Sequence, residues 1–280
     1  MRFWDIILSV FLFSAPAPAQ ISTNWTVRPL SSVYAMYLPG ACMKSDHATI
    51  DNVNGYLLIT GDVTTNTCSD KNLNGTLRNG PFTLPYTGAE MFTTSFNFTY
   101  GTVEYRAKFP IVHGSWPIIW MLGVPCQSTY PFTTDNVGAC NWNVPPSDEL
   151  DITEYISGVY GTGIHSSNGS NACAPSGDSV PTWHVYQLVW SAGSAIWKRD
   201  GATVCTITTA VPSTPMFIII DFLMSSTAGS VTPSDFPQTF TIDYLKVTQG
   251  STVIFDDEFN PVSGTSASGS ITATGKVVFQ

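Results

Sequence analysis

Helical periodicity is almost absent from this chain, and short β-favouring runs recur along its length instead. Clusters of Gly, Pro, Asn and Ser separate the runs, as turns separate neighbouring strands of an antiparallel sheet. Many strands without helices between them favour a sandwich or a barrel over strand–helix–strand units. We predict strands at residues 55–60, 92–98, 102–109, 117–123, 149–156, 182–191, 195–199, 216–224 and 239–249.

The size and composition of the chain limit its domain number and its partners. No repeat or linker divides the 280 residues, so we expect one all-β sandwich domain over residues 20–280. Hydrophobic residues make up 43% and charged residues only 11%, which excludes a disordered chain. A formal net charge of −9 argues against a nucleic-acid partner, which requires a basic surface. We expect a monomer whose Ser-, Thr- and Gly-rich stretch 263–280 is a flexible tail or a weak strand.

The first residues have the features of a secretory signal peptide. Arg2 supplies positive charge, residues 6–13 form a short apolar stretch, and residues 17–19 (Ala-Pro-Ala) give a cleavage pattern of small residues. We therefore predict a signal peptide at 1–19. The apolar stretch is too short to span a bilayer and no later stretch is long enough, so we expect a secreted protein without a membrane segment.

The cysteines fit an oxidising compartment, and none of their spacings is the Cys-x-x-Cys of a zinc or redox site. Sequence proximity favours three pairings among the six, namely Cys42–Cys68, Cys126–Cys140 and Cys173–Cys205. In a eukaryotic host, glycans would attach at the sequons Asn24, Asn74, Asn97 and Asn168.

Three acidic residues stand close together on one predicted strand, where like charges repel one another. In a regular strand Glu149 and Asp151 share a face, and Glu154 lies on the opposite face. A one-residue β-bulge near residues 152–153 would bring Glu154 to the face of the other two. The glutamates would then be four strand steps apart, roughly 13 Å between Cα atoms. Side chains that lean toward each other would approach the carboxyl separation of ~5–5.5 Å found in retaining glycosidases.

Two such carboxyls would divide the chemistry of glycoside hydrolysis by charge. An ionised Glu149 would attack the anomeric carbon, while Glu154, kept protonated by the nearby negative charge, would act as acid and base. Asp151 would orient Glu149 and help to hold the shared proton. Taken alone, the three acids are as compatible with an exposed acidic strand or with calcium ligands in a loop.

The flanking segments favour the catalytic alternative. Residues 114–122 read Gly-Ser-Trp-Pro-Ile-Ile-Trp-Met-Leu, and residues 149–154 read Glu-Leu-Asp-Ile-Thr-Glu. Together they resemble the Trp-Pro-Ala-x-Trp-Met-Leu and Glu-x-Asp-x-x-Glu strands of the laminarinase-like branch of glycoside hydrolase family 16. Similar segments follow the family's order at 100–110, 183–190, 197–201 and 240–249. The resemblance implies a concanavalin-like β-jelly roll of two antiparallel sheets, with a sugar cleft on its concave face and a retaining, endo-acting mechanism.

The sequence departs from the family pattern at two places. The family has an Asp-Glu-Phe-Asn-like segment near its N-terminus, whereas this chain carries it at 257–260, after the last predicted strand. The segment is either a permuted edge strand or a chance similarity. In addition, Ile118 and Ile119 replace the small residue that follows the Trp-Pro pair, which would narrow the cleft locally.

Candidate substrate-binding residues follow from the same resemblance. Trp116 and Trp120 lie four residues apart on one face of their strand and would stack on sugar rings, with core packing as the alternative. Glu104 and Arg106 match cleft positions of the family, with a surface ion pair as the alternative. His165 matches a position beside the catalytic strand, where it would hydrogen-bond the acid/base or a sugar hydroxyl, or else be structural.

Two more residues complete the candidates. Trp142 lies in a long predicted loop, 125–146, before the catalytic strand and would overhang the cleft as a subsite residue. Asp243 matches the position at which family members bind a structural calcium ion, and oxygen ligands suit calcium, so we expect modest stabilisation by calcium. No catalytic metal or organic cofactor is implied.

The resemblance implies an endo-β-1,3-glucanase, with mixed-linkage β-1,3-1,4-glucan as a second polysaccharide substrate. One alternative is a cell-wall glucan transglycosylase of the same fold, in which a sugar hydroxyl replaces water. Another is a non-catalytic glucan-binding lectin, although a lectin has no need of Glu149, Asp151 and Glu154.

Overall fold

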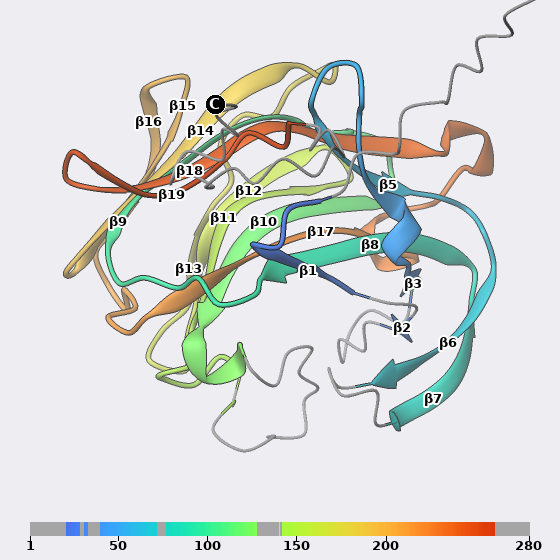
Figure 1. The fold of residues 1–280 in the computed structure, drawn as a ribbon, viewed down its shortest axis with the longest axis horizontal. Helices are drawn as coiled ribbons and strands as arrows, with labels where there is room; N and C mark the ends of the chain where they lie inside the picture. Colours follow the sequence, from blue (N-terminus) through green and yellow to red (C-terminus); the bar gives the residue numbers. More distant parts are fainter. Residues whose placement is uncertain are drawn as a thin grey trace, which may run out of the picture.

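The computed structural model of the chain describes residues 21–28, 31–32, 40–71, 77–127, 140 and 142–260 (Figure 1). The predicted signal peptide at 1–19, the sequon at Asn74 and the predicted tail at 263–280 lie outside the described residues. Within the described part, helix is limited to short 3-10 turns, none of which is long and apolar enough to cross a membrane. These turns are η1 (Ser45–His47), η2 (Val124–Cys126), η3 (Ser226–Ala228) and η4 (Pro233–Asp235).

Two large sheets account for most of the described chain, as the strand pattern predicts. The nine-stranded sheet has the order β13-β12-β11-β10-β17-β8-β3-β2, with β1 also on β8, and only β3–β8 is parallel. Its strands are β1 (Trp25–Val27), β2 (Ser31–Ser32), β3 (Ala41–Met43), β8 (Tyr86–Thr93), β10 (Ser115–Gly123), β11 (Glu149–Ile156), β12 (Val159–His165), β13 (Asn171–Cys173) and β17 (Met216–Met224).

The second large sheet is eight-stranded and antiparallel, with the order β16-β15-β14-β9-β18-β5-β4 and β19 on the end of β18. Its strands are β4 (Ala48–Ile50), β5 (Leu57–Gly61), β9 (Gly101–Lys108), β14 (Trp183–Ser191), β15 (Ser194–Arg199), β16 (Ala202–Ile207), β18 (Gln238–Gln249) and β19 (Thr252–Asp257). A separate hairpin consists of β6 (Asn66–Lys71) and β7 (Leu77–Leu84).

The core lies between the two large sheets, and side-chain alternation explains how each sheet contributes to it. In β9, Val103, Tyr105 and Ala107 are fully buried in the core, while the residues between them are half-buried on the other side of the sheet. Almost every residue of β17 is buried, because its two faces meet the core and a second apolar cluster on the opposite side. The predicted all-β sandwich is therefore confirmed.

The strand predictions differ in how well they match the structure. Residues 149–156 and 216–224 match β11 and β17 at both ends. The predicted strand 92–98 is wrong over most of its length, because β8 ends at Thr93. Beyond it, Phe96 and Phe98 stack on each other (ring centroids 5.5 Å apart) and pack on the core from an irregular segment, so their apolar character reflects burial rather than a strand.

The sequence placed the Asp-Glu-Phe-Asn segment after the last predicted strand. The structure has one more strand, β19, which follows β18 and includes Asp257, the first residue of the segment. Asp257 Oδ2 accepts hydrogen bonds from Trp25 Nε1 (2.9 Å) and Ser22 Oγ (2.6 Å) near the start of the described chain. Phe259 packs against the Trp25 ring, with centroids 6.1 Å apart. The segment is thus a structured edge of the sandwich, which favours the permuted edge strand over a chance similarity.

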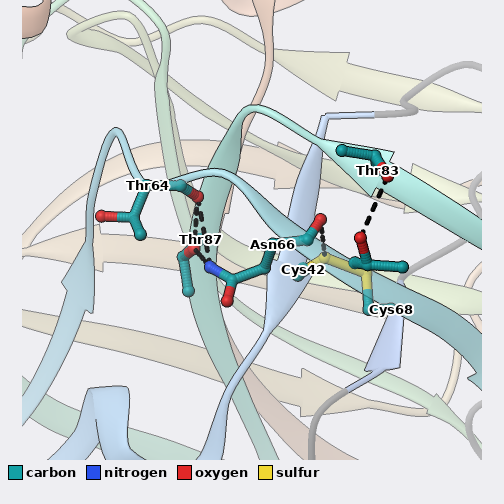
Figure 2. The surroundings of a disulfide bond; sticks show 7 residues. Cys42, Thr64, Asn66, Cys68, Thr83 and Thr87 are labelled. Atoms are coloured by element: carbon teal, nitrogen blue, oxygen red, sulfur yellow. Dashed lines mark hydrogen bonds between the residues drawn. A yellow bond between two sulfur atoms is a disulfide. The ribbon is translucent and has the colours of Figure 1, made fainter.

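All three predicted disulfides are confirmed: Cys42–Cys68, Cys126–Cys140 and Cys173–Cys205. Figure 2 shows the Cys42–Cys68 bond, which joins β3 to β6. Next to it, Asn66 Nδ2 donates a hydrogen bond to the hydroxyl of Thr87 on β8 (2.7 Å). The β6–β7 hairpin is therefore fastened to the edge of the nine-stranded sheet by one covalent bond and by polar contacts.

Candidate active site

A bulge in β11 brings the three acidic side chains to one face of the nine-stranded sheet. Along β10, Ile119 pairs with Thr153 and Trp120 with Asp151, so Ile152 is the extra residue. The register against β12 shifts between Asp151 and Glu154 in the same way. Ile152 is buried in the core, and Glu149, Asp151 and Glu154 share the face away from it, which we call the catalytic face. The predicted bulge is confirmed.

Hydrogen bonds to the backbone hold the bulge in place. The Thr162 hydroxyl on β12 reaches the carbonyls of both Asp151 (2.7 Å) and Ile152 (3.1 Å). Trp197, from β15 of the other sheet, donates its indole N–H to the Asp151 carbonyl across the core (2.9 Å). The irregular carbonyls of the bulge are thus satisfied internally, as buried backbone groups must be.

Each of the three acids has a different neighbour. Glu149 Oε2 accepts a hydrogen bond from Trp142 Nε1, and Glu154 Oε1 accepts one from Trp116 Nε1 (2.5 Å). Asp151 Oδ2 lies 3.0 Å from His165 Nε2. On β12, His165 is in register with Glu149, and its side chain contacts the central aspartate. The predicted contact of His165 with the acid/base Glu154 is not formed.

Burial and like charge raise the pKa values of both glutamates. Burial, followed by the charge of Asp151, raises the pKa of Glu149 well above its usual range, and His165 and the Trp142 N–H oppose this rise. The same two causes raise the pKa of Glu154 to about 8, opposed by the Trp116 N–H. The hydrogen bond to Asp151 raises the pKa of His165 to about 9, so a positive charge lies beside the acids at neutral pH. The site therefore retains protons on carboxyl groups at pH values where free carboxyls are ionised.

The two predicted tryptophan platforms do lie on the catalytic face. Trp116 and Trp120 are both partly exposed, and Ile118 lies between them, in register with Glu154 on one side and Asp221 on the other. Ile119 turns into the core, so only Ile118 could narrow a substrate groove on this face. Stacking of sugars on the two indoles stays a prediction.

Sequence reasoning missed a buried charge cluster on the same face. Asp221 on β17 is in register with Glu90 on the neighbouring strand β8. Glu90 forms a salt bridge of 2.6 Å with Arg28, just after β1. Asp221 Oδ2 accepts a hydrogen bond from Trp120 Nε1 (2.9 Å). Burial, followed by the charge of Glu90, raises the pKa of Asp221 well above its usual range. A lone acid in the apolar run 216–224 was the available sign, because buried acids are rare unless they have a partner.

Glu104 and Arg106 were wrongly placed in the cleft. Both lie on β9 of the eight-stranded sheet, on its outer face, and the whole core separates them from the catalytic strand. Glu104 accepts hydrogen bonds from Lys246 Nζ (2.8 Å) and Gln187 Nε2 (2.7 Å). Each forms a surface ion pair with another residue, Glu104 with Lys246 and Arg106 with Asp243, so the surface alternative is right about the location and wrong about the partner.

The residue set around Asp243 does not fit the predicted calcium ion. Asp243 Oδ2 is paired with Arg106 Nη1 at 2.7 Å, so a guanidinium already neutralises the carboxylate that calcium would need. Among the described residues, Glu149, Asp151 and His165 do bring possible ligand atoms within 4.8 Å of one another. That group is the ion-paired centre of the acidic trio, and we assign no metal to it.

The sequence matches the family model of the glycosyl hydrolases family 16 over residues 56–246. The chain belongs to this family. A glucan endo-1,3-beta-glucosidase A1 of Niallia circulans is 30% identical over 176 residues, which are 53% of this chain and 24% of that protein. A beta-glucanase of Rhodothermus marinus is 28% identical over 189 residues, 58% of this chain and 62% of that protein. This chain therefore spans less than two thirds of the length of these curated relatives.

The fold agrees with solved structures of the family. A laminarinase from Flavobacterium sp. UMI-01 superposes with a TM-score of 0.63 at 24% identity, covering 83% of this chain and 96% of that one. A laminarinase catalytic domain from Thermotoga maritima also gives a TM-score of 0.63, at 22% identity. The β-jelly-roll sandwich implied by the resemblance is confirmed.

Proposed function

We propose that this protein is a secreted, retaining endo-glycosidase that hydrolyses β-1,3-glucan and, secondarily, mixed-linkage β-1,3-1,4-glucan. The observation that carries the proposal is the bulge in β11, which aligns Glu149, Asp151 and Glu154 on one face beside two partly exposed tryptophans. A strand without the bulge would turn Glu154 into the core. Membership of a family of glycosyl hydrolases supports the same chemistry.

The mechanism follows from the different surroundings of the two glutamates. Glu149, whose ionised form is stabilised by the Trp142 N–H and the His165 cation, attacks the anomeric carbon and forms a glycosyl ester. Glu154, with a pKa of about 8, gives its proton to the departing glycosidic oxygen. Glu154 then takes a proton from water, the water attacks the anomeric carbon, and the bond to Glu149 breaks.

Asp151 and His165 set the pKa values of the two glutamates during the reaction. Asp151 lies between the glutamates on the catalytic face, and its charge raises the pKa values of both, so the pair holds a proton that Glu154 donates while Glu149 attacks as the carboxylate. His165 pairs with Asp151 and limits that effect, because its positive charge lowers the pKa values of both glutamates. When Glu149 loses its charge on forming the ester, the pKa of Glu154 falls, which suits its change from acid to base.

Several features support a neutral glucan and an extracellular location. Trp116 and Trp120 offer apolar faces to pyranose rings, and the chain has only eleven Lys and Arg residues for an anionic polymer. Two matched relatives are named as glucanases acting on β-glucan or β-1,3-glucan linkages. The three disulfides are typical of proteins in an oxidising compartment and support export.

The test is reducing-end release from laminarin, lichenan, xyloglucan and agarose by the parent, Glu149→Gln and Glu154→Gln. We expect turnover of laminarin first and lichenan second, and a loss of at least ~1000-fold in kcat for each variant. Proton NMR of the first product should show the β-anomer, as retention requires. A folded parent that turns over none of the four glycans would refute the proposal, and lengthened oligosaccharides would point to transglycosylation.

A further inference from the structure

Trp142 reaches the candidate nucleophile from outside the sheet. Its indole N–H donates to Glu149 Oε2, although Trp142 lies on no strand and precedes β11 by several residues. The other glutamate has a matching donor, because Trp116 Nε1 lies 2.5 Å from Glu154 Oε1. The two donors are held in place differently. Trp116 is part of β10, whereas the position of Trp142 depends on the irregular segment before β11.

A disulfide fixes that segment two residues before Trp142. Cys126 ends the short turn η2 directly after β10, and it is bonded to Cys140 with a Cα–Cα distance of 4.5 Å. Both cysteines are buried in an apolar cluster with Leu122 and Phe217, and Trp142 packs against this cluster. The Cys126–Cys140 bond therefore ties Trp142 to the end of the strand that neighbours β11.

Backbone hydrogen bonds fix the other side of Trp142. Asn143 N donates to the carbonyl of Ser147 (3.0 Å), and Ser167 N donates to the carbonyl of Asn143 (2.6 Å). Gly123 N donates to the carbonyl of Asp148, immediately before Glu149. Within the described part of the chain, the indole is thus held between the disulfide and a small set of backbone hydrogen bonds.

We propose that Trp142 is a positioning residue for the nucleophile Glu149, and that the Cys126–Cys140 disulfide holds it there, so that activity depends on the oxidation state of this bond. The inference rests on the proposed function, in which Glu149 attacks as a carboxylate. An N–H that donates to a carboxylate favours its charged form and fixes the direction of its oxygens. Reduction of the disulfide by a thiol reductant, which is itself oxidised to a disulfide as the two cysteines become thiols, would release the donor, and Glu149 would hold its proton to higher pH.

The first experiment uses Trp142→Phe, which keeps an aromatic ring and removes the N–H. A hydrogen bond to a charged group changes an ionisation constant by about tenfold or more. We expect the acidic limb of kcat/KM on laminarin to move up by about one pH unit, with kcat below that limb reduced about tenfold and KM nearly unchanged. The matched variant Trp116→Phe should instead move the alkaline limb upward, because it acts on Glu154.

The second experiment removes the bond with Cys126→Ala/Cys140→Ala, since alanine avoids burying unpaired hydroxyls. The acidic limb should move in the same direction as in Trp142→Phe, and combining the two changes should add little, as expected when they act through one contact. The matched control is Cys42→Ala/Cys68→Ala, which removes the bond from β6 to β3 near the β2 edge of the nine-stranded sheet and should leave the pH profile unchanged. An unchanged profile in Trp142→Phe overturns the role of the indole, and an unchanged profile in the folded Cys126/Cys140 variant overturns the role of the disulfide.

A titration that needs no turnover separates this inference from the proposed function. In protein labelled with carbon-13 at the glutamate carboxyls, the pKa of Glu149 should rise in Trp142→Phe and in Cys126→Ala/Cys140→Ala. If the parent is inactive on every glucan but the shift occurs, the proposed function fails while the positioning contact stands. If the parent is active and neither variant shifts Glu149, the inference fails by itself.

Discussion

The buried pair Arg28–Glu90 allows a stability prediction with a defined magnitude. Arg28 Nε lies 2.6 Å from Glu90 Oε1, and the two side chains are only 3% and 1% exposed. Arg28 N also donates to the Glu90 carbonyl (2.9 Å), which fixes the start of the described chain on β8. The perturbation is Arg28→Met, which keeps the length of the side chain and removes its charge.

The cost follows from what remains after the change. Glu90 would be left buried and next to Asp221, whose high pKa already reflects burial and the charge of Glu90. Breaking a buried pair from one side costs about 3–5 kcal/mol, a large share of the ~5–15 kcal/mol that stabilises a typical domain. Glu90→Met should cost less, about 1–3 kcal/mol, because Asp221 can ionise and become the partner of Arg28.

The assay is urea unfolding at neutral pH for both single variants and for Arg28→Met/Glu90→Met. The double variant should lose less stability than Arg28→Met, since replacing both charges removes the carboxylate that loses its cation in Arg28→Met. A loss below ~1 kcal/mol in Arg28→Met, or a double variant whose loss equals the sum of the two, would contradict this account of the cluster.

Further predictions concern the protonation of Glu154, the carboxylate of Asp243 and the segment before β11. Because the pKa of Glu154 is raised from 4.5 to about 8, turnover of laminarin should fall as pH rises through about 8. Between pH 4.5 and about 8 the folded state also binds more protons than the unfolded state, so the free energy of unfolding should fall as pH rises across that window. If this free energy falls as steeply with pH in Glu154→Gln, another group is responsible. Since Arg106 already pairs with Asp243, a chelator should leave the melting temperature unchanged, and a drop of several degrees would restore the calcium hypothesis. In Gly123→Ala the new Cβ would lie 1.9 Å from the Pro146 carbonyl oxygen, so we expect a loss of about 1–3 kcal/mol in urea unfolding and reduced turnover; parent-like values in both would show that the segment before β11 moves freely.

The sequence determined the features that depend on near neighbours in the chain. The bulge in β11 could be predicted because Glu149, Asp151 and Glu154 share a face only if one residue is inserted. The common face of Trp116 and Trp120 follows from strand alternation, which is a local property. All three disulfides join cysteines that are neighbours in the order of the cysteines, so proximity sufficed.

Only the tertiary structure decided which strands meet and which of their faces is covered. Alternation puts Glu104 and Arg106 on one face of β9, but it does not say that this face belongs to the sheet opposite the acids. Arg28, Glu90 and Asp221 meet through pairings between strands far apart in the sequence, and no local pattern encodes such pairings. The contact of Trp142 with Glu149 depends in the same way on where a disulfide holds a segment outside the sheet. Strand periodicity fixes the two faces of a strand, whereas its partners and its covered side are set by the burial of the whole chain.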